Sequence, residues 1–317
     1  MKANYATIGV NPQVLHNDCE ASLDEKNHVP SILSWAQKAG KATGIVTTTR
    51  ITHASPAGTY ANVANRDWES DDDINKFPDT QNCSDIAKQL IRGEIGQNFN
   101  VIYGGGRRKL ISDKIISVED GKRGQRVDGL DLIDEWLSKK NSPKAHYIHD
   151  RKGLLNLNAS DVENVLGIFN SDHLKYHLSN ADESEPSLPE MTKSAIEILQ
   201  KNPKGFVLFV LFVDHAHHDN LARHALEETV EFSKAVQTAV EATDEKDTLI
   251  VVSSDHAHTM TLNGYSARGK DILGLNSELS DIDGMPYSSL SYANGPSGGK
   301  QRYKMADDEM GKNLSCF

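Results

Sequence analysis

The fold is decided by residues 206–219, which read FVLFVLFVDHAHHD. Eight consecutive apolar residues are far fewer than the ~20 needed to cross a bilayer. They are typical of a strand buried on both faces of a parallel sheet. A charged, histidine-rich segment follows at once. We therefore predict an interior strand whose carboxyl end opens onto a polar site.

The same alternation of apolar runs and helical segments extends along the chain. Further β-branched or apolar runs lie at 44–48, 99–103 and 248–252. Segments of helical period lie at 31–39, 84–92, 130–137, 191–199 and, most clearly, 220–241. This pattern predicts an α/β fold, a three-layer sandwich with a largely parallel central sheet. We take residues 1–317 as one domain.

Composition and charge exclude several classes of function. The 317 residues are 38% hydrophobic and 25% charged, which is an ordinary balance for a globular protein. The formal charge is -11 and the longest basic run is Arg107-Arg108-Lys109, so a nucleic-acid backbone would be repelled. We expect no nucleic-acid partner. We also expect neither a signal peptide nor a lipid-anchor signal within the chain as printed.

Two histidine clusters follow predicted strands, DHAHHD at 214–219 and DHAH at 255–258. Ligands of open α/β sheets bind beyond the carboxyl ends of the strands, so we expect the two clusters to meet there. Neutral imidazole and carboxylate suit zinc, and Asp214 and His218 stand four apart, on one face of a helical turn. Either cluster alone is more often a hydrogen-bonded loop. Their joint placement favours a metal site.

A third segment carries a specific resemblance. Residues 47–58 read TTTRITHASPAG and residues 65–68 read NRDW. With YATIGV at 5–10, GGGR at 104–107, SDHAH at 254–258 and YANGP at 292–296, this ordered set resembles the animal-type alkaline phosphatases over nearly the whole chain. The resemblance implies hydrolysis of phosphate monoesters with two Zn2+ ions and one Mg2+ ion. It also implies a homodimer that is extracellular and lipid-anchored to the plasma membrane.

The resemblance assigns roles to individual residues. The metal ligands it implies are Asp214 and His218 for one zinc ion, Asp255 and His256 for the other, and Ser55 for magnesium, with His53 beside the magnesium site. Arg66 matches the arginine that holds the substrate phosphate, a role that suits a planar guanidinium with parallel donors. A sulfatase or phosphodiesterase of similar fold would keep Asp-His pairs, but would not be expected to carry the TTTR and HASPAG strings.

Three further features follow from the resemblance or bear on it. Cys19 and Cys83 match a family disulfide, which leaves Cys316 unpaired. Animal members also have a Ca2+ site, matched by Glu135, the Phe169 carbonyl and Glu185, although Asn170 stands where an acidic ligand is usual. Calcium therefore stays an open alternative to a solvated acidic loop. Glycosylation is weakly indicated by Asn-X-Ser/Thr triplets at Asn82, Asn158 and Asn313.

The chain departs from the family at positions that matter for catalysis. The family's nucleophilic serine and metal-bridging aspartate lie upstream of the segment matched by Tyr5, and a zinc-ligand histidine lies beyond Phe317. The family's magnesium-binding glutamate is missing from the shorter stretch before Asp214. We therefore expect a fold truncated at both ends and no catalytic nucleophile within the chain. Two interpretations stay open: a partial copy of an active enzyme, or an inactive relative that at most binds metal or phosphate.

Overall fold

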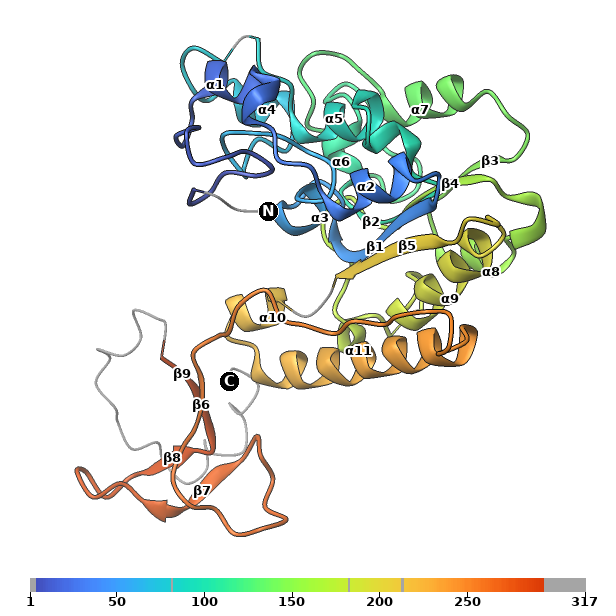
Figure 1. Ribbon diagram of the computed structural model, residues 1–317. Coiled ribbons are helices and arrows are strands. Elements are labelled where there is room, and N and C mark those ends of the chain that lie inside the picture. Colours follow the sequence, from blue (N-terminus) through green and yellow to red (C-terminus); the bar gives the residue numbers. More distant parts are fainter. Residues whose placement is uncertain (1–3, 81, 182, 212–213, 294–317) are drawn as a thin grey trace.

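A parallel five-stranded sheet forms the centre of the computed structural model, which describes residues 4–80, 82–181, 183–211 and 214–293 (Figure 1). Its strands are β1 (Ala42–Arg50), β2 (Val101–Gly105), β3 (Ala145–Ile148), β4 (Asn164–Ile168) and β5 (Phe206–Leu211). Their order in space is β3-β4-β2-β1-β5, and every neighbouring pair is parallel. The predicted α/β fold with a largely parallel sheet is confirmed.

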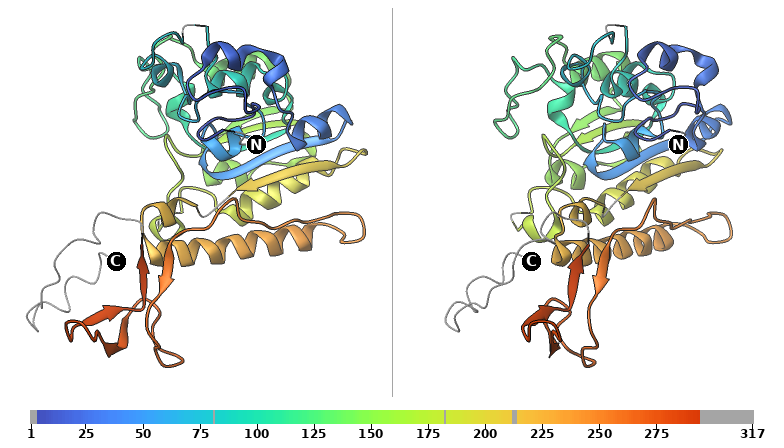
Figure 2. Two further views of the ribbon diagram at one scale, coloured as in Figure 1. Left: turned by 60° about the vertical axis from the view of Figure 1, so that its left-hand side comes forward. Right: turned by 90° about the vertical axis from the view of Figure 1, so that its left-hand side faces the viewer.

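Helices cover both faces of the sheet because successive strand residues point to opposite sides. Ile45 and Leu166 belong to one hydrophobic core, and their neighbours Val46 and Val165 belong to the other. The first core is closed by α2 (Ile32–Lys38), α5 (Ile86–Arg92) and α7 (Leu132–Lys140). The second is closed by α9 (Leu188–Leu199), with α11 (Ala222–Ala242) packed outside it, as Figure 2 shows. The result is a sandwich of three layers.

Shorter helices connect these layers. The α-helices are α1 (Cys19–Leu23), α3 (Ala54–Ala57), α4 (Asp71–Ile74), α6 (Arg107–Leu110), α8 (Arg151–Leu155) and α10 (Asp214–His218). The 3-10 turns are η1 (Glu25–Asn27), η2 (Gly96–Asn98), η3 (Ala159–Asp161) and η4 (His177–Ser179). Within the described ranges, every helix is too short or too polar to span a bilayer.

Two cross-links hold the loops on the first face of the sheet. Cys19 and Cys83 form a disulfide with Cα atoms 5.9 Å apart, which confirms the expected pairing. Arg126 is fully buried and pairs with Asp85 at 2.9 Å and Asp128 at 2.6 Å. Two carboxylates around one buried guanidinium satisfy its charge, so this ion-pair group can persist away from water.

The sequence prediction is wrong at the distal edge of the sheet. Residues 248–252 form no strand, and Leu249 and Val251 are 86% and 76% exposed. β5, expected to be fully buried, is partly exposed along its whole length because it is the edge strand of the described sheet. Residues 248–252 run back alongside α11 without a strand partner in the described chain (Figure 1). An apolar sequence is therefore not sufficient for a strand, because the backbone N–H and C=O groups of a strand need a neighbouring strand to hydrogen-bond with.

The remaining strands form two small antiparallel pairs away from the main sheet (Figure 1). β6 (Met260–Leu262) pairs with β9 (Leu290–Tyr292), and β7 (Leu275–Leu279) pairs with β8 (Pro286–Ser288). Whether residues 1–317 constitute one domain stays a prediction.

Candidate functional site

The carboxyl ends of β1, β4 and β5 bring three histidines together. The ring centroid of His53, after β1, lies 4.9 Å from that of His215 in α10 and 5.5 Å from that of His173, after β4. The rings of His173 and His215 are 3.8 Å apart. We call His53, His173 and His215 the inner histidine group. β1 and β5 pair in register from Ala42 with Phe206 onward, so their following segments emerge side by side.

Arg50 holds the inner histidine group in place through a backbone hydrogen bond to His173. The backbone N–H of Arg50 donates to Nδ1 of His173 at 3.0 Å, and its guanidinium pairs with Glu69 and Asp172, each at 2.6 Å. Burial and, to a smaller extent, the neighbouring His215 lower the pKa of His53 to about 4. Burial and His215 likewise lower the pKa of His173 to about 2. These two imidazoles are therefore neutral at neutral pH.

Arg66 and Ser55 lie on the same side of the sheet. Arg66 is half-buried, its backbone N–H donates to the Ala6 carbonyl at 2.7 Å, and its positive charge contributes to lowering the pKa of His53. Ser55 is half-buried in α3, two residues after His53. His53 Nδ1 is buried and has no hydrogen-bond partner among the described residues. The segment after β1 thus presents a guanidinium, a hydroxyl and a neutral imidazole.

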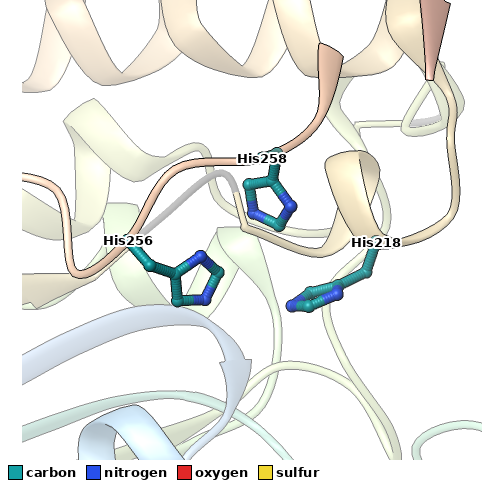
Figure 3. A group of neighbouring side chains, drawn as sticks. All are labelled: His218, His256 and His258. Carbon is teal, nitrogen blue, oxygen red and sulfur yellow. The ribbon is translucent and has the colours of Figure 1, made fainter. Parts of the chain in front are cut away.

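A second set of three imidazoles lies beyond α10. His218, at the end of α10, faces His256 and His258, and potential ligand atoms of all three lie within 4.8 Å of one another (Figure 3). We call them the outer histidine group. The structure therefore brings His218 and His256 together, although residues 248–252 are not a sheet strand. His258 was not among the predicted site residues, yet its position in the DHAH string was a visible signal.

Carboxylates predicted beside these histidines are placed less closely. Asp255 is exposed, and its Oδ2 lies 3.6 Å from Nε2 of His256 but outside the three-histidine group. Asp214 begins α10, but its side chain lies outside the part of the chain that the structure describes. Among the side chains that the structure describes, the outer group consists of imidazoles.

The residues expected for calcium are not all assembled. Asn170 donates to Glu185 at 2.6 Å, directly after Phe169 at the end of β4. Glu135 instead pairs with Arg92 of α5 at 2.7 Å and with Lys139 at 3.1 Å. Hydrogen bonds from Arg92 lower the pKa of Glu135 to about 2. Its carboxylate is thus already neutralised between α5 and α7.

Two other features lie apart from the predicted site. His177, Glu227 and Glu231 also place ligand atoms within 4.8 Å of one another, but Lys234 pairs with Glu231 at 2.6 Å and balances its charge. A cleft of about 520 Å3 opens at the amino ends of β1 and β4, on the opposite edge of the sheet, and its lining includes none of the predicted site residues. The two histidine groups therefore lie outside this cleft.

Comparison with known proteins gives consistent results. The alkaline phosphatase family model matches residues 1–314. A membrane-bound alkaline phosphatase of Bombyx mori is 49% identical over 301 residues, which cover 93% of this chain and 54% of the relative. The tissue-nonspecific alkaline phosphatase of Homo sapiens is 43% identical over 303 residues, with coverages of 93% and 57%. The chain spans less than two thirds of the length of these relatives.

Solved structures agree on the fold. The Thermus thermophilus alkaline phosphatase aligns with a TM-score of 0.57 at 24% identity, over 78% of this chain and 42% of that structure. The alkaline phosphatase of the Antarctic bacterium TAB5 aligns with a TM-score of 0.61 at 21% identity, over 92% and 69%. A variant of the TAB5 enzyme has magnesium bound. At these identities the likeness establishes the fold alone.

Proposed function

The chain belongs to the alkaline phosphatase family, and from that premise we propose that it serves metal-dependent hydrolysis of phosphate monoesters at the carboxyl edge of its sheet. The observation that carries this proposal is the placement of the inner histidine group after β1, β4 and β5, with Arg66 near His53 and with the outer group at the end of α10. A catalytic zinc site commonly uses three protein ligands and leaves one position for water or substrate. The outer histidine group offers such a donor set.

The residues proposed as metal ligands fit zinc and magnesium in their chemistry. Asp214, His218, Asp255 and His256 would hold zinc, and Ser55 would contribute to magnesium binding. When bound, these ions polarise a phosphoryl oxygen and lower the pKa of coordinated water. Nδ1 of His256 donates to the Ala257 carbonyl at 3.1 Å, which assigns the ring's lone pair to Nε2. A second hydrogen bond of this kind typically orients a metal-binding imidazole.

Arg66 is the residue proposed to hold the phosphate. Arg50, the other guanidinium near the inner histidine group, is already paired with Glu69 and Asp172. Arg66 forms no ion pair with any residue that the structure describes, so its parallel N–H groups can donate to the oxygens of a phosphate dianion. Neutral His53 beside it adds no competing charge. Arg66 therefore clamps and orients the substrate.

The test is hydrolysis of p-nitrophenyl phosphate at alkaline pH with added zinc and magnesium. Any turnover should fall at least about 100-fold in Arg66→Ala, the usual cost of removing a charge-stabilising donor. Arg223→Ala is the matched control, because Arg223 is exposed on α11 and away from the proposed site. Equal turnover in the wild type and in Arg66→Ala would refute the proposal. So would the loss of both activities, that is, no turnover and no Arg66-dependent binding of inorganic phosphate. Phosphate binding without turnover would leave the inactive alternative.

We also propose that the protein is secreted, forms a dimer and binds calcium. The Cys19–Cys83 disulfide supports an oxidising compartment, and a relative in Bombyx mori is membrane-bound. We propose an extracellular, lipid-anchored homodimer. Asn82 and Asn158 are exposed and can carry glycans, whereas Asn313 lies outside the described residues, as does Cys316. For calcium, the proposal draws on Asn170 and Glu185, which lie in contact after β4.

A further inference from the structure

The cleft at the amino ends of β1 and β4 lies beside one of the Asn-X-Ser/Thr triplets of the sequence. Asn158 is exposed at the start of η3, and Ser160, the hydroxyl residue of its triplet, lines the cleft. We propose that Asn158 carries an N-linked glycan and that the first N-acetylglucosamine of this glycan occupies the cleft. The proposal rests on the export of the chain proposed above. It gives a role to a cavity that lies apart from the proposed phosphatase site.

The local structure at Asn158 is compatible with the modification. Oδ1 of Asn158 accepts the hydroxyl of Ser160 at 2.8 Å, and Nδ2 donates to Oδ2 of Asp161 at 2.7 Å. Glycan transfer forms a bond between Nδ2 and C1 of the sugar and breaks the bond from C1 to the pyrophosphate of a lipid-linked oligosaccharide donor. One amide proton and the lipid pyrophosphate leave. Because the modified amide keeps one N–H and its oxygen, both contacts can persist in the folded chain.

The cleft has the size and the apolar surface to hold a sugar ring. Its volume of about 520 Å3 lies within the range of roughly 300–1,000 Å3 that is typical of small-ligand pockets. The apolar part of its lining consists of Ala42, Val162, Ile198, Leu199 and Pro203. A pyranose ring presents C–H groups on its faces and polar groups at its edge. One face of the ring can therefore pack on the apolar part and leave water.

Polar groups in the cleft retain donors for the edge of the sugar. A lysine ammonium has three donors. Nζ of Lys144 uses one on Glu163 at 2.8 Å, and Nζ of Lys201 uses two on the carbonyls of Ala159 and Val162. Each lysine therefore has at least one N–H left for a sugar oxygen. Three amide side chains also line the cleft, those of Asn100, Asn164 and Asn202.

The charges around the cleft favour a neutral ligand. Lys144 pairs with Glu163, and Lys201 is the second cation in the lining. Asp161, which accepts Nδ2 of Asn158, adds a second carboxylate beside it. Two cations against two carboxylates leave no net charge that would select an anion. A neutral sugar attached beside the cleft wall is also held there at high effective concentration, which favours its binding.

The first test is peptide mass analysis of the full chain secreted from eukaryotic cells behind a supplied signal peptide. We expect a glycan on Asn158 that is retained in Ser160→Thr and lost in Ser160→Ala, because the triplet requires a hydroxyl at its third position. Asn82→Gln is the matched control and should leave the modification of Asn158 unchanged. An unmodified Asn158 in the secreted wild type, or a glycan that persists in Ser160→Ala, would overturn the proposal.

The second test locates the first sugar by acylation of lysines in the folded protein. An endoglycosidase trims the glycan to its first N-acetylglucosamine, so that only a sugar seated in the cleft can still shield the lining. We expect Lys144 to react several-fold more slowly in trimmed wild type and trimmed Ser160→Thr than in Ser160→Ala, whereas Lys26, exposed in η1, should react equally in all three. Equal rates at Lys144 would overturn the placement of the sugar. Neither readout uses phosphate-ester turnover, so failure here is distinguishable from failure of the proposed function.

Discussion

Glu228 is a buried carboxylate that makes the stability of this chain depend on pH. It lies on α11 with 4% of its surface exposed, and it accepts the backbone N–H of His177 at 2.7 Å. Glu227 and Glu231 lie on the same helix, and Lys234 pairs with Glu231. Burial raises the pKa of Glu228 to about 7, and the two neighbouring carboxylates contribute to the rise.

The size and sign of the effect follow from this shift. The rise from 4.5 to about 7 corresponds to about 3 kcal/mol at 1.36 kcal/mol for each pH unit. Because the folded state holds the proton more tightly, protonated Glu228 stabilises the fold below pH 4.5. That contribution is lost as pH rises through 7. Glu228→Gln keeps an oxygen acceptor for His177 but removes the titration. We expect the variant to exceed the wild type by about 3 kcal/mol in free energy of unfolding at pH 8, and to match it near pH 4.5.

Urea denaturation at several pH values measures this difference. Glu241→Gln, an exposed change on the same helix, removes an equal charge and should show no comparable pH dependence. If Glu228→Gln and the wild type kept a constant difference from pH 4.5 to 8, the carboxylate would not titrate in this range. The electrostatic account of this helix contact would then be wrong.

Three further changes test how the scaffold is held together. Replacing Cys19 and Cys83 by serine should lower the free energy of unfolding by about 4 kcal/mol, from the chain-entropy cost of a 64-residue separation, as thermal melts with and without reductant would reveal. Arg126→Met should cost about 3–5 kcal/mol because it leaves Asp85 buried with only the more distant Lys88, 3.7 Å away, as a cation, and Asp85→Asn in the same background should recover part of that loss in urea titrations. Gly105→Ala should destabilise by about 1–3 kcal/mol, since a Cβ there would lie 2.0 Å from a carbonyl oxygen of the loop after β4; an unchanged melting temperature would contradict that packing.

The central elements could be predicted because their patterns are local. Apolar runs correspond to β1, β2 and β5, and the five segments of helical period correspond to α2, α5, α7, α9 and α11. β3 and β4 were missed. β4 is short and contains a glycine. β3 reads AHYI, and its histidine and tyrosine carry polar atoms, so neither segment formed a recognisable apolar run in the sequence. Their place in the sheet is settled by pairing with β2, which is information the segments do not contain themselves.

The distal strand shows the opposite failure. Residues 248–252 have the composition of an interior strand, but composition states only that burial would be favourable, not that a partner is present. In the described part of the main sheet β5 is the edge strand, and this segment remains exposed. The two histidine clusters nevertheless meet, because residues 253–258 pass close to the end of α10. The predicted meeting of the clusters was right, but the predicted reason was wrong.

The inner and outer histidine groups are positioned by different forces, and this difference bears on how each can work. His53 and His215 follow β1 and β5, whose paired register fixes where both segments begin, and Arg50 then anchors His173 against them. That group is held in place by the sheet and by Arg50. His256 and His258 lie instead on an extended, largely exposed segment, so fewer packing contacts fix their rings. Binding free energy of a metal would there be partly used to order the ligands, which lowers affinity but makes the site respond to metal. The sheet thus supplies a rigid surface for the inner histidine group, and under the proposed function a bound ion would complete the outer half of the site.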